Sequence, residues 1–200
     1  MAVIHRTTMV PTKLDLLTEW LPKQDWYLGD HASPSLARAG GFRLDDPAGE
    51  VGIEFMVVRD DASNEVTAYH LPMTYRDAPL TGADAALIGT SEHGVLGLRW
   101  IYDGTADPVL LAALMELTRG RVQAQAQSQT DTPDATVHVV PGPVAPGEAF
   151  GISFARLLVP QDAEPSSGPP SGTAQVTALW TALDGAPIRS VLAATHPLPD

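Results

Sequence analysis

Six side chains are candidate contacts to a ligand or a partner protein: Trp26, Tyr75, Arg76, Asp77, Trp100 and Asp103. Tryptophan and tyrosine rings beside charged groups form platforms in sugar-binding sites and in protein interfaces. The competing interpretation of each tryptophan is packing in the core. For the loop that holds Arg76 and Asp77, the competing interpretation is an internal ion pair between these two residues. The six are therefore binding candidates, and no catalytic residue is predicted.

Patterns typical of catalysis or metal binding are not found. The chain has no Cys, which excludes disulfides, thiolate nucleophiles and iron–sulfur clusters. Its six His do not pair at helical metal-ligand spacing, and His70 and His138 are expected to be half-buried structural residues in strands. The segment 89–94 (GTSEHG) lacks the glycine spacing of a nucleophile elbow and is predicted to be a turn. The aspartate pairs at 45–46 and 60–61 also fall in predicted turns. No metal and no cofactor is predicted.

The charge balance limits the predicted partners. The 200 residues carry 24 Asp and Glu against 12 Lys and Arg, a formal net charge of −12. Nucleic acids and anionic membrane surfaces both attract clustered basic residues, so neither is a predicted partner. No apolar run has the length of a membrane span, and no signal peptide is visible at the N-terminus. We expect a cytoplasmic protein.

Two helices and about eight strands must position the candidates. Leucines at spacings of three and four predict a helix over Lys13–Leu21 that Pro22 ends. Asp107 is the predicted cap of a second helix, Pro108–Arg119, which Gly120 stops. The predicted strands are Leu36–Leu44 (broken by Gly40-Gly41), Val51–Arg59, Glu65–Pro72, Ser91–Tyr102, Thr136–Val140, Ala149–Val159, Thr173–Leu183 and Ile188–Thr195.

These elements predict an α+β fold around an antiparallel sheet. Apolar residues recur at every second position from Val51 to Val57, so one face of the sheet is expected to lie on a core, with the helix Pro108–Arg119 as its cover. Residues 121–135 are rich in glutamine and are predicted to be a surface loop or linker. Residues 136–200 are predicted to add strands packed on the same domain, and a separate subdomain is the alternative.

The segment Trp20–Tyr27 (WLPKQDWY) resembles the W-L-P-x-Q-x-W-[FY] pattern of the N-terminal cap domain of actinobacterial maltokinases. Tyr69–Arg76 (YHLPMTYR) is similar to the Y-x-[VL]-P-[LM]-x-Y-R pattern of the same domain. Residues 86–90 (ALIGT) and 100–104 (WIYDG) continue the likeness, which covers residues 1–120. The resemblance implies a curved antiparallel sheet wrapped on a helix, similar to cystatins.

The resemblance does not extend to the kinase itself. A maltokinase phosphorylates maltose with ATP and feeds α-glucan synthesis, and its C-terminal lobe needs a catalytic Asp in an H-G-D-x-H-x-x-N loop. Leu28-Gly29-Asp30-His31 repeats only part of that loop, and 200 residues leave no room for both kinase lobes. The resemblance therefore supports a relative of the cap, and it does not support ATP-dependent phosphorylation.

Three functions are compatible with these observations. The preferred one is a non-catalytic accessory or regulatory module of α-glucan (maltose, trehalose, glycogen) metabolism that binds a kinase-like chain or a glucan enzyme. The alternative is a carbohydrate-binding module that uses exposed Trp and Tyr, and the third is an enzyme with an unrecognised site. An exposed apolar patch would favour the first, and a solvent-facing tryptophan beside Asp or Arg in a cleft the second. Clustered titratable groups with perturbed pKa values in a pocket would favour the third.

Overall fold

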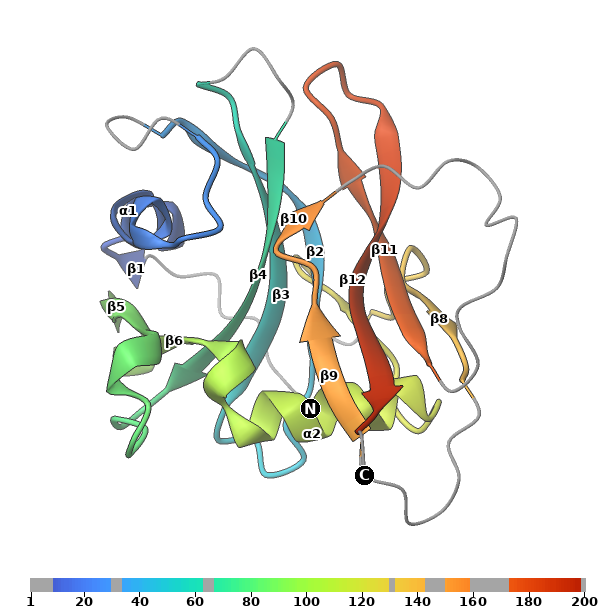
Figure 1. The fold of residues 1–200 in the computed structure, drawn as a ribbon. Helices are drawn as coiled ribbons and strands as arrows, with labels where there is room; N and C mark the ends of the chain where they lie inside the picture. Colours follow the sequence, from blue (N-terminus) through green and yellow to red (C-terminus); the bar gives the residue numbers. More distant parts are fainter. Residues whose placement is uncertain are drawn as a thin grey trace.

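The structure of the chain is a computed structural model that describes residues 9–29, 34–62, 67–129, 132–142, 150–158 and 173–198. These residues form a twelve-stranded sheet with antiparallel pairing, two α-helices and three 3₁₀ turns (Figure 1). The predicted α+β class with an antiparallel sheet is confirmed, and the sheet has more strands than the eight predicted. The cystatin-like detail stays a prediction.

The strands in chain order are β1 (Met9–Val10), β2 (Leu36–Leu44), β3 (Gly52–Asp60), β4 (Thr67–Arg76), β5 (Leu87–His93), β6 (Gly97–Asp103), β7 (Gln125–Ala126), β8 (His138–Val140), β9 (Phe150–Phe154), β10 (Leu157–Leu158), β11 (Gln175–Thr181) and β12 (Pro187–Pro197). The main order across the sheet is β1-β5-β6-β4-β3-β2-β11-β12-β9. β10 follows β9 in the chain but pairs with β4. The sheet therefore curls until its C-terminal strands meet β4 again.

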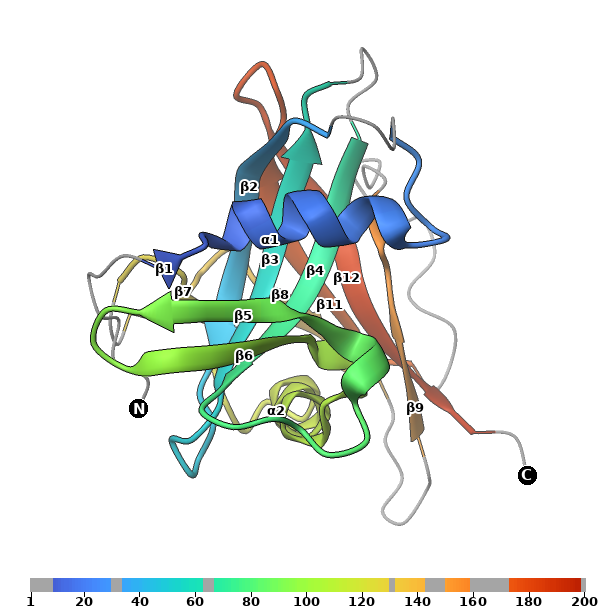
Figure 2. The same ribbon diagram turned by 90° about the vertical axis from the view of Figure 1, so that its left-hand side faces the viewer.

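Helix α1 (Lys13–Trp20) lies across the outer face of β2, β3 and β4 (Figure 2). Thr12 caps the helix, because its side chain accepts a hydrogen bond from the Asp15 backbone and the Asp15 carboxylate accepts one from the Thr12 backbone. Pro22 lies in a 3₁₀ turn, Leu21–Lys23, that continues the helix. The buried residues of this outer core are Leu17, Trp20, Leu21, Tyr27, Met56, Val58, Tyr69, Leu71, Met73 and Ile101.

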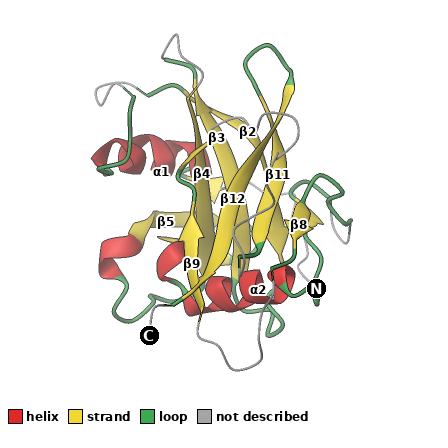
Figure 3. Ribbon diagram, turned by 45° about the vertical axis from the view of Figure 1, so that its right-hand side comes forward, coloured by secondary structure: helices red, strands yellow, loops and turns green. Residues whose placement is uncertain are grey.

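Helix α2 (Pro108–Thr118) covers the inner core at the end of the sheet away from the β11–β12 turn (Figure 3). Asp107 caps it through the backbone N–H of Val109, and Gly120 follows it with a φ of 69°. Both features confirm the predicted helix. Leu110, Leu114 and Leu117 pack in a core shared by β2, β3, β11 and β12, in which Val51, Ile53, Phe55 and Val57 lie as their spacing predicts.

Three predicted strands differ from the structure. Leu36–Leu44 is not broken, because Gly40 and Gly41 both pair with β3, and the irregularity in register lies just before them, between Arg38 and Gly40. Ser91–Tyr102 is wrong as a single strand, because the chain reverses at residues 94–96, between β5 and β6. Gly97, which begins β6 after the turn, has a φ of 72° that suits glycine. The predicted turn at 89–94 lies mostly within β5. Ala149–Val159 is divided into β9 and β10 at residues 155–156.

Parts of other predicted elements lie outside the described residues, including the start of Glu65–Pro72 and the kinase-like letters at Asp30 and His31. His138 is exposed in β8, so its predicted half-burial is wrong, whereas His70 is fully buried in β4.

Candidate functional site

Arg76 and Asp77, two of the six candidates, do not form an ion pair with each other. Asp77 is exposed in the loop after β4. Arg76 pairs with the buried carboxylate of Asp107 instead, through Nε–Oδ2 and Nη2–Oδ1 contacts of 2.7 Å each. Burial alone would raise the pKa of Asp107, but the hydrogen bonds from Arg76 and from the Val109 backbone outweigh it and lower the pKa. One carboxylate therefore joins the end of β4 to the start of α2.

Trp26 and Asp103 are brought together by Arg156, which the sequence did not single out. The guanidinium lies over the Trp26 ring, 5.1 Å from its centre, and also pairs with the Asp103 carboxylate. It donates a further hydrogen bond of 3.1 Å to the Thr105 hydroxyl. Arg156 lies between β9 and β10, so this cluster ties the returning C-terminal chain to the strands before α2.

The Trp26 ring has further aromatic neighbours. Its centre lies 6.0 Å from that of Trp20 and 6.1 Å from that of Tyr69. Tyr69 and Tyr27 are buried beside it, and the Tyr27 hydroxyl donates to Asp60 over 2.6 Å. Rings in such mutual contact contribute to packing. Trp26 therefore packs against the outer core and is not a free platform for a ligand.

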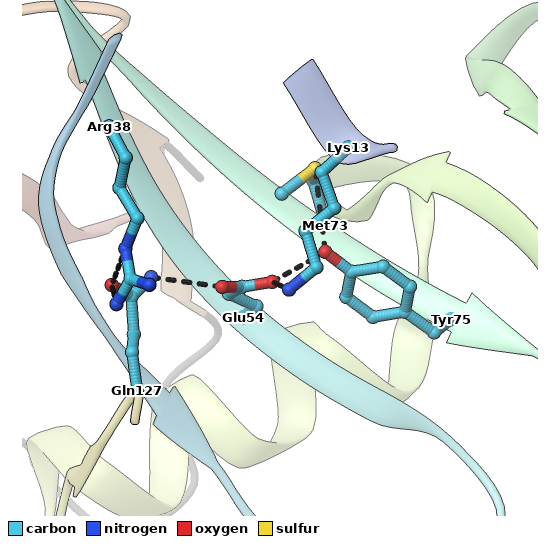
Figure 4. Close-up of polar contacts among 6 residues, drawn as sticks. All are labelled: Lys13, Arg38, Glu54, Met73, Tyr75 and Gln127. Atoms are coloured by element: carbon cyan, nitrogen blue, oxygen red, sulfur yellow. Dashed lines mark hydrogen bonds and ion pairs between the residues drawn. The ribbon is translucent and has the colours of Figure 1, made fainter. Parts of the chain in front are cut away.

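Tyr75 belongs to a polar cluster around the buried carboxylate of Glu54 (Figure 4). Its hydroxyl donates to Glu54 Oε2 over 2.5 Å, and Lys13 Nζ lies 2.6 Å from the same oxygen. Gln127 donates to Glu54 Oε1 over 3.0 Å, and Arg38 in turn donates to the Gln127 carbonyl. The cluster joins α1, β2, β3, β4 and the segment after β7.

The charges in this cluster favour a fixed structure over proton exchange. Burial by itself would raise the pKa of Glu54, but the charge of Lys13 and the hydrogen bonds from Lys13 and Tyr75 lower it. Burial and then the Glu54 charge raise the pKa of Tyr75 well above its ordinary value of 10.0. Both pKa values move away from neutrality, the opposite of what a general acid or base needs.

Trp100 lies on a surface formed by β1, β5 and β6. Val10, Glu92 and Leu98 form one row across these three strands, and Thr90 pairs with Trp100 in a neighbouring row. Side chains alternate along a strand, so Trp100 shares its face with Leu98, while Ile101 points the other way and is buried. Together with the turn between β5 and β6, these residues form what we call the hairpin surface: Val10, Glu92, Val95, Leu96, Leu98 and Trp100.

A cleft of about 430 Å³ lies elsewhere, between α2 and β9. Its lining is mostly apolar, and no candidate side chain contributes to it. The lining residues are Thr105, Leu111, Ala112, Met115, Arg119, Phe150, Ile152 and Phe154.

Three side chains that hold the candidates in place were missed for different reasons. The sequence does contain a signal for Glu54, because this carboxylate interrupts the apolar strand around Val51–Val58. Asp107 was identified as a cap, but its pairing with Arg76 joins residues 31 positions apart. Arg156 follows a strand with no local pattern that marks it, and its partners come from distant segments.

Two features are absent from the described ranges. No group of three or more His, Asp or Glu gathers there in a way that could hold a metal ion. Among the same residues, no helix is long and apolar enough to cross a membrane.

A model of one known protein family matches part of the chain. Residues 20–107 match the model of the maltokinase N-terminal cap domain. No curated protein matches the chain. The matched segment runs from the end of α1 to the cap of α2, and includes all six candidate side chains and Glu54, whereas Gln127 and Arg156 lie beyond it. Residues 20–107 of this chain are therefore similar to the maltokinase N-terminal cap domain, which supports a cap-like domain in this segment.

Proposed function

We propose that the chain is a non-catalytic accessory module of α-glucan metabolism that binds a kinase-like protein chain through the hairpin surface. The observation that carries the proposal is the exposure of this surface. Val10, Val95, Leu96 and Leu98 are 66%, 61%, 46% and 39% exposed. Contiguous exposed apolar residues mark interaction sites on soluble proteins.

The position of the surface supports a link to the family. β5 and β6 lie within the segment that matches the cap domain of a maltose kinase. In a maltokinase the cap precedes the kinase lobes in the same chain, so a cap-like chain has reason to present an apolar surface to a kinase-like partner. Glu92 lies in the row between Val10 and Leu98, so the complementary surface should be apolar with a basic group opposite Glu92.

The contacts of the other candidates favour a binding role over a catalytic one. Arg76 is held by Asp107, and Asp103 by Arg156. Tyr75 is held by Glu54, and its raised pKa keeps it protonated. Groups engaged in this way stabilise the module, and the hairpin surface is left as the region that a partner would contact.

The test is calorimetric titration of the full chain with a purified kinase-like chain of the aminoglycoside-phosphotransferase type from the same genome. Leu98→Glu places a charge in the centre of the hairpin surface and should weaken binding about tenfold or more. Leu183→Glu is the matched control, because Leu183 is 62% exposed in the distant β11–β12 turn. Equal affinity of both variants, or no binding by the unaltered chain, would reject the proposal.

Sugar binding is the second candidate because Trp100 is half-buried on an open face. Titration with maltose, trehalose and glycogen separates it from partner binding. Heat of binding that Trp100→Ala abolishes, together with no affinity for the kinase-like chain, would favour the carbohydrate-binding module.

A further inference from the structure

Strand β9 has one edge that no strand pairs with in the part of the chain that the structure describes. It stands last in the strand order, with β12 on its other side. Directly after β9, the Ala155 N–H donates to the Leu192 carbonyl of β12 over 2.9 Å. Backbone groups of successive residues point to opposite sides of a strand, so every second residue of β9 bonds β12. The N–H and C=O groups of the remaining residues, Phe150, Ile152 and Phe154, therefore face the open edge.

The same edge is paired a little further along the chain. The Arg156 carbonyl accepts from the His70 N–H of β4 over 2.9 Å, and β10 continues this pairing (Figure 1). Next along β4 on this side comes Pro72, which has no N–H to donate. From Met73 onward, β4 pairs with β6 instead. β4 therefore pairs with β10 and leaves β9 with an unpaired edge.

β9 lacks two devices that commonly protect a free strand edge. Its sequence, FGISF, contains no charged residue and no proline. Native proteins often protect exposed edges with such residues, because an unprotected edge is a template for another strand. The side chains of Phe150, Ile152 and Phe154 share one face and line the cleft beside α2. This apolar side and the open edge together suit a strand with apolar residues at alternate positions.

The sequence of β9 is nearly symmetric about Ile152. Read in either direction, it gives a phenylalanine, a small residue, the isoleucine, a small residue and a phenylalanine. In antiparallel pairing about a two-fold axis at Ile152, this residue lies opposite its equivalent, and Phe150 lies opposite Phe154. Opposite residues whose backbone groups point at each other exchange two hydrogen bonds, and these three residues are the ones that face the open edge. The strand is therefore complementary to a second copy of itself in backbone and side chains.

We propose that β9 pairs with β9 of a second copy of this chain, antiparallel about a two-fold axis at Ile152. The pairing gives each outward N–H and C=O group of the strand a partner. It also places the phenylalanine and isoleucine side chains of both copies on one face, where they shield each other from water. The interface lies at the edge of the sheet opposite β1, so it leaves the hairpin surface free and does not depend on the proposed partner.

The test is sedimentation equilibrium of the full chain over a range of concentrations. We expect a reversible equilibrium between monomer and dimer. Ile152→Lys and Ile152→Glu each place like charges opposite each other at the axis, and each should weaken dimerisation about tenfold or more. An equimolar mixture of the two variants should restore a dimer, because lysine then lies opposite glutamate. An unaltered chain that is monomeric at every concentration, or a mixture that stays monomeric, would overturn the proposal.

Three further variants locate the contact. Ser153→Lys adds the same charge at the next residue, which is exposed on the other face of β9, so the dimer should persist. Leu98→Glu alters the hairpin surface and should also leave the dimer intact. Ile152→Pro removes the central outward N–H without touching the ladder to β12, so it should weaken the dimer.

Loss of the dimer in Leu98→Glu would mean that the copies meet through the hairpin surface and would overturn the site. Equal loss in Ser153→Lys and Ile152→Lys, or a dimer of unchanged strength in Ile152→Pro, would do the same. Thermal unfolding of each variant verifies that the sheet remains folded.

Discussion

His70 is buried between aromatic rings on the inner face of β4. Its ring centre lies 5.9 Å from that of Phe55 and 6.4 Å from that of Phe154, and Nδ1 lies 3.1 Å from the Ala155 carbonyl oxygen. Burial, and then the positive charge of Arg156, lower the pKa of His70 to about 3. The ring is therefore neutral in the folded chain at pH values where it is already protonated in the unfolded chain.

This difference predicts how stability depends on pH. Below its unfolded pKa of about 6.5, His70 binds a proton only in the unfolded state, so the free energy of unfolding falls as the pH falls from there toward 3. The slope from this residue approaches about 1.4 kcal/mol per pH unit. His70→Gln should flatten the curve of unfolding free energy by that amount between pH 6 and pH 4.5, as measured by urea denaturation.

His138→Gln is the control for the His70 prediction. His138 is exposed in β8, so His138→Gln controls for the loss of a histidine that is not part of the core. A His70→Gln variant with the same slope as the unaltered chain would contradict the buried neutral histidine.

Of the side-chain contacts in the candidate site, only those between residues close in the sequence could be predicted. Asp107 was identified as a cap because its acceptor role depends on Val109, two positions away. The competing interpretation, an ion pair between Arg76 and the adjacent Asp77, is not what forms. Successive side chains at the end of a strand point to opposite faces, and Arg76 makes its bidentate contact with Asp107 instead. Arg156 could not be predicted, because its contacts depend on how the sheet curls.

At the scale of the elements, Gly41 allows β2 to pair closely with β3. Its φ is 119°, and a methyl group there would collide with the Phe55 carbonyl oxygen in the paired strand. Gly41→Ala should therefore lower the free energy of unfolding by about 2–3 kcal/mol, through backbone strain and loss of β2–β3 hydrogen bonds. Urea denaturation provides the measurement.

Gly49→Ala is the matched control for Gly41→Ala. Gly49 also has a positive φ, 74°, but a methyl group there has no neighbour within 4 Å. Its cost should be only that of the backbone conformation, about 1 kcal/mol. Equal losses in the two variants would mean that the close approach to β3 has no consequence.

The elements were predicted well where the signal is local. The cap, proline and glycine around α2 gave its bounds nearly as the structure has them, and Leu36–Leu44 matches β2. The reversal between β5 and β6 was missed, because Val95, Leu96 and Leu98 continue an apolar stretch through the turn. The apolar residues that hid the turn are the ones that now form the hairpin surface.

At the scale of the whole molecule, the residues beyond the cap segment complete its sheet. β11 joins β2 at Trp180 and Gly40, and β10 returns to pair with β4. Arg156 binds Trp26 and Asp103 at that return, so the C-terminal strands are joined to the cap segment by ladder hydrogen bonds and by charge. The pairing between distant strands could not be read from the sequence, because alternation predicts a strand without naming its neighbour.

In the strand order across the sheet, β1 stands at one edge and β9 at the other. The hairpin surface, which includes β1, therefore lies at the edge opposite β9. The C-terminal strands therefore cover the inner face of β2, β3 and β4 and leave β1, β5 and β6 uncovered by other strands in the described part of the chain. A partner that binds the hairpin surface would meet the cap segment without disturbing the strands added after it.

The most direct measurement of partner binding is site-specific photo-cross-linking. A photoreactive benzoylphenylalanine at position 95, in the turn of the hairpin surface, is compared with the same group at position 183 in the β11–β12 turn. Both positions are highly exposed, so their reactivity toward random collisions is matched. We predict that the kinase-like chain cross-links at position 95 and not at position 183. Cross-linking at position 183 alone, or equally weak cross-linking at both positions, would contradict partner binding through the hairpin surface.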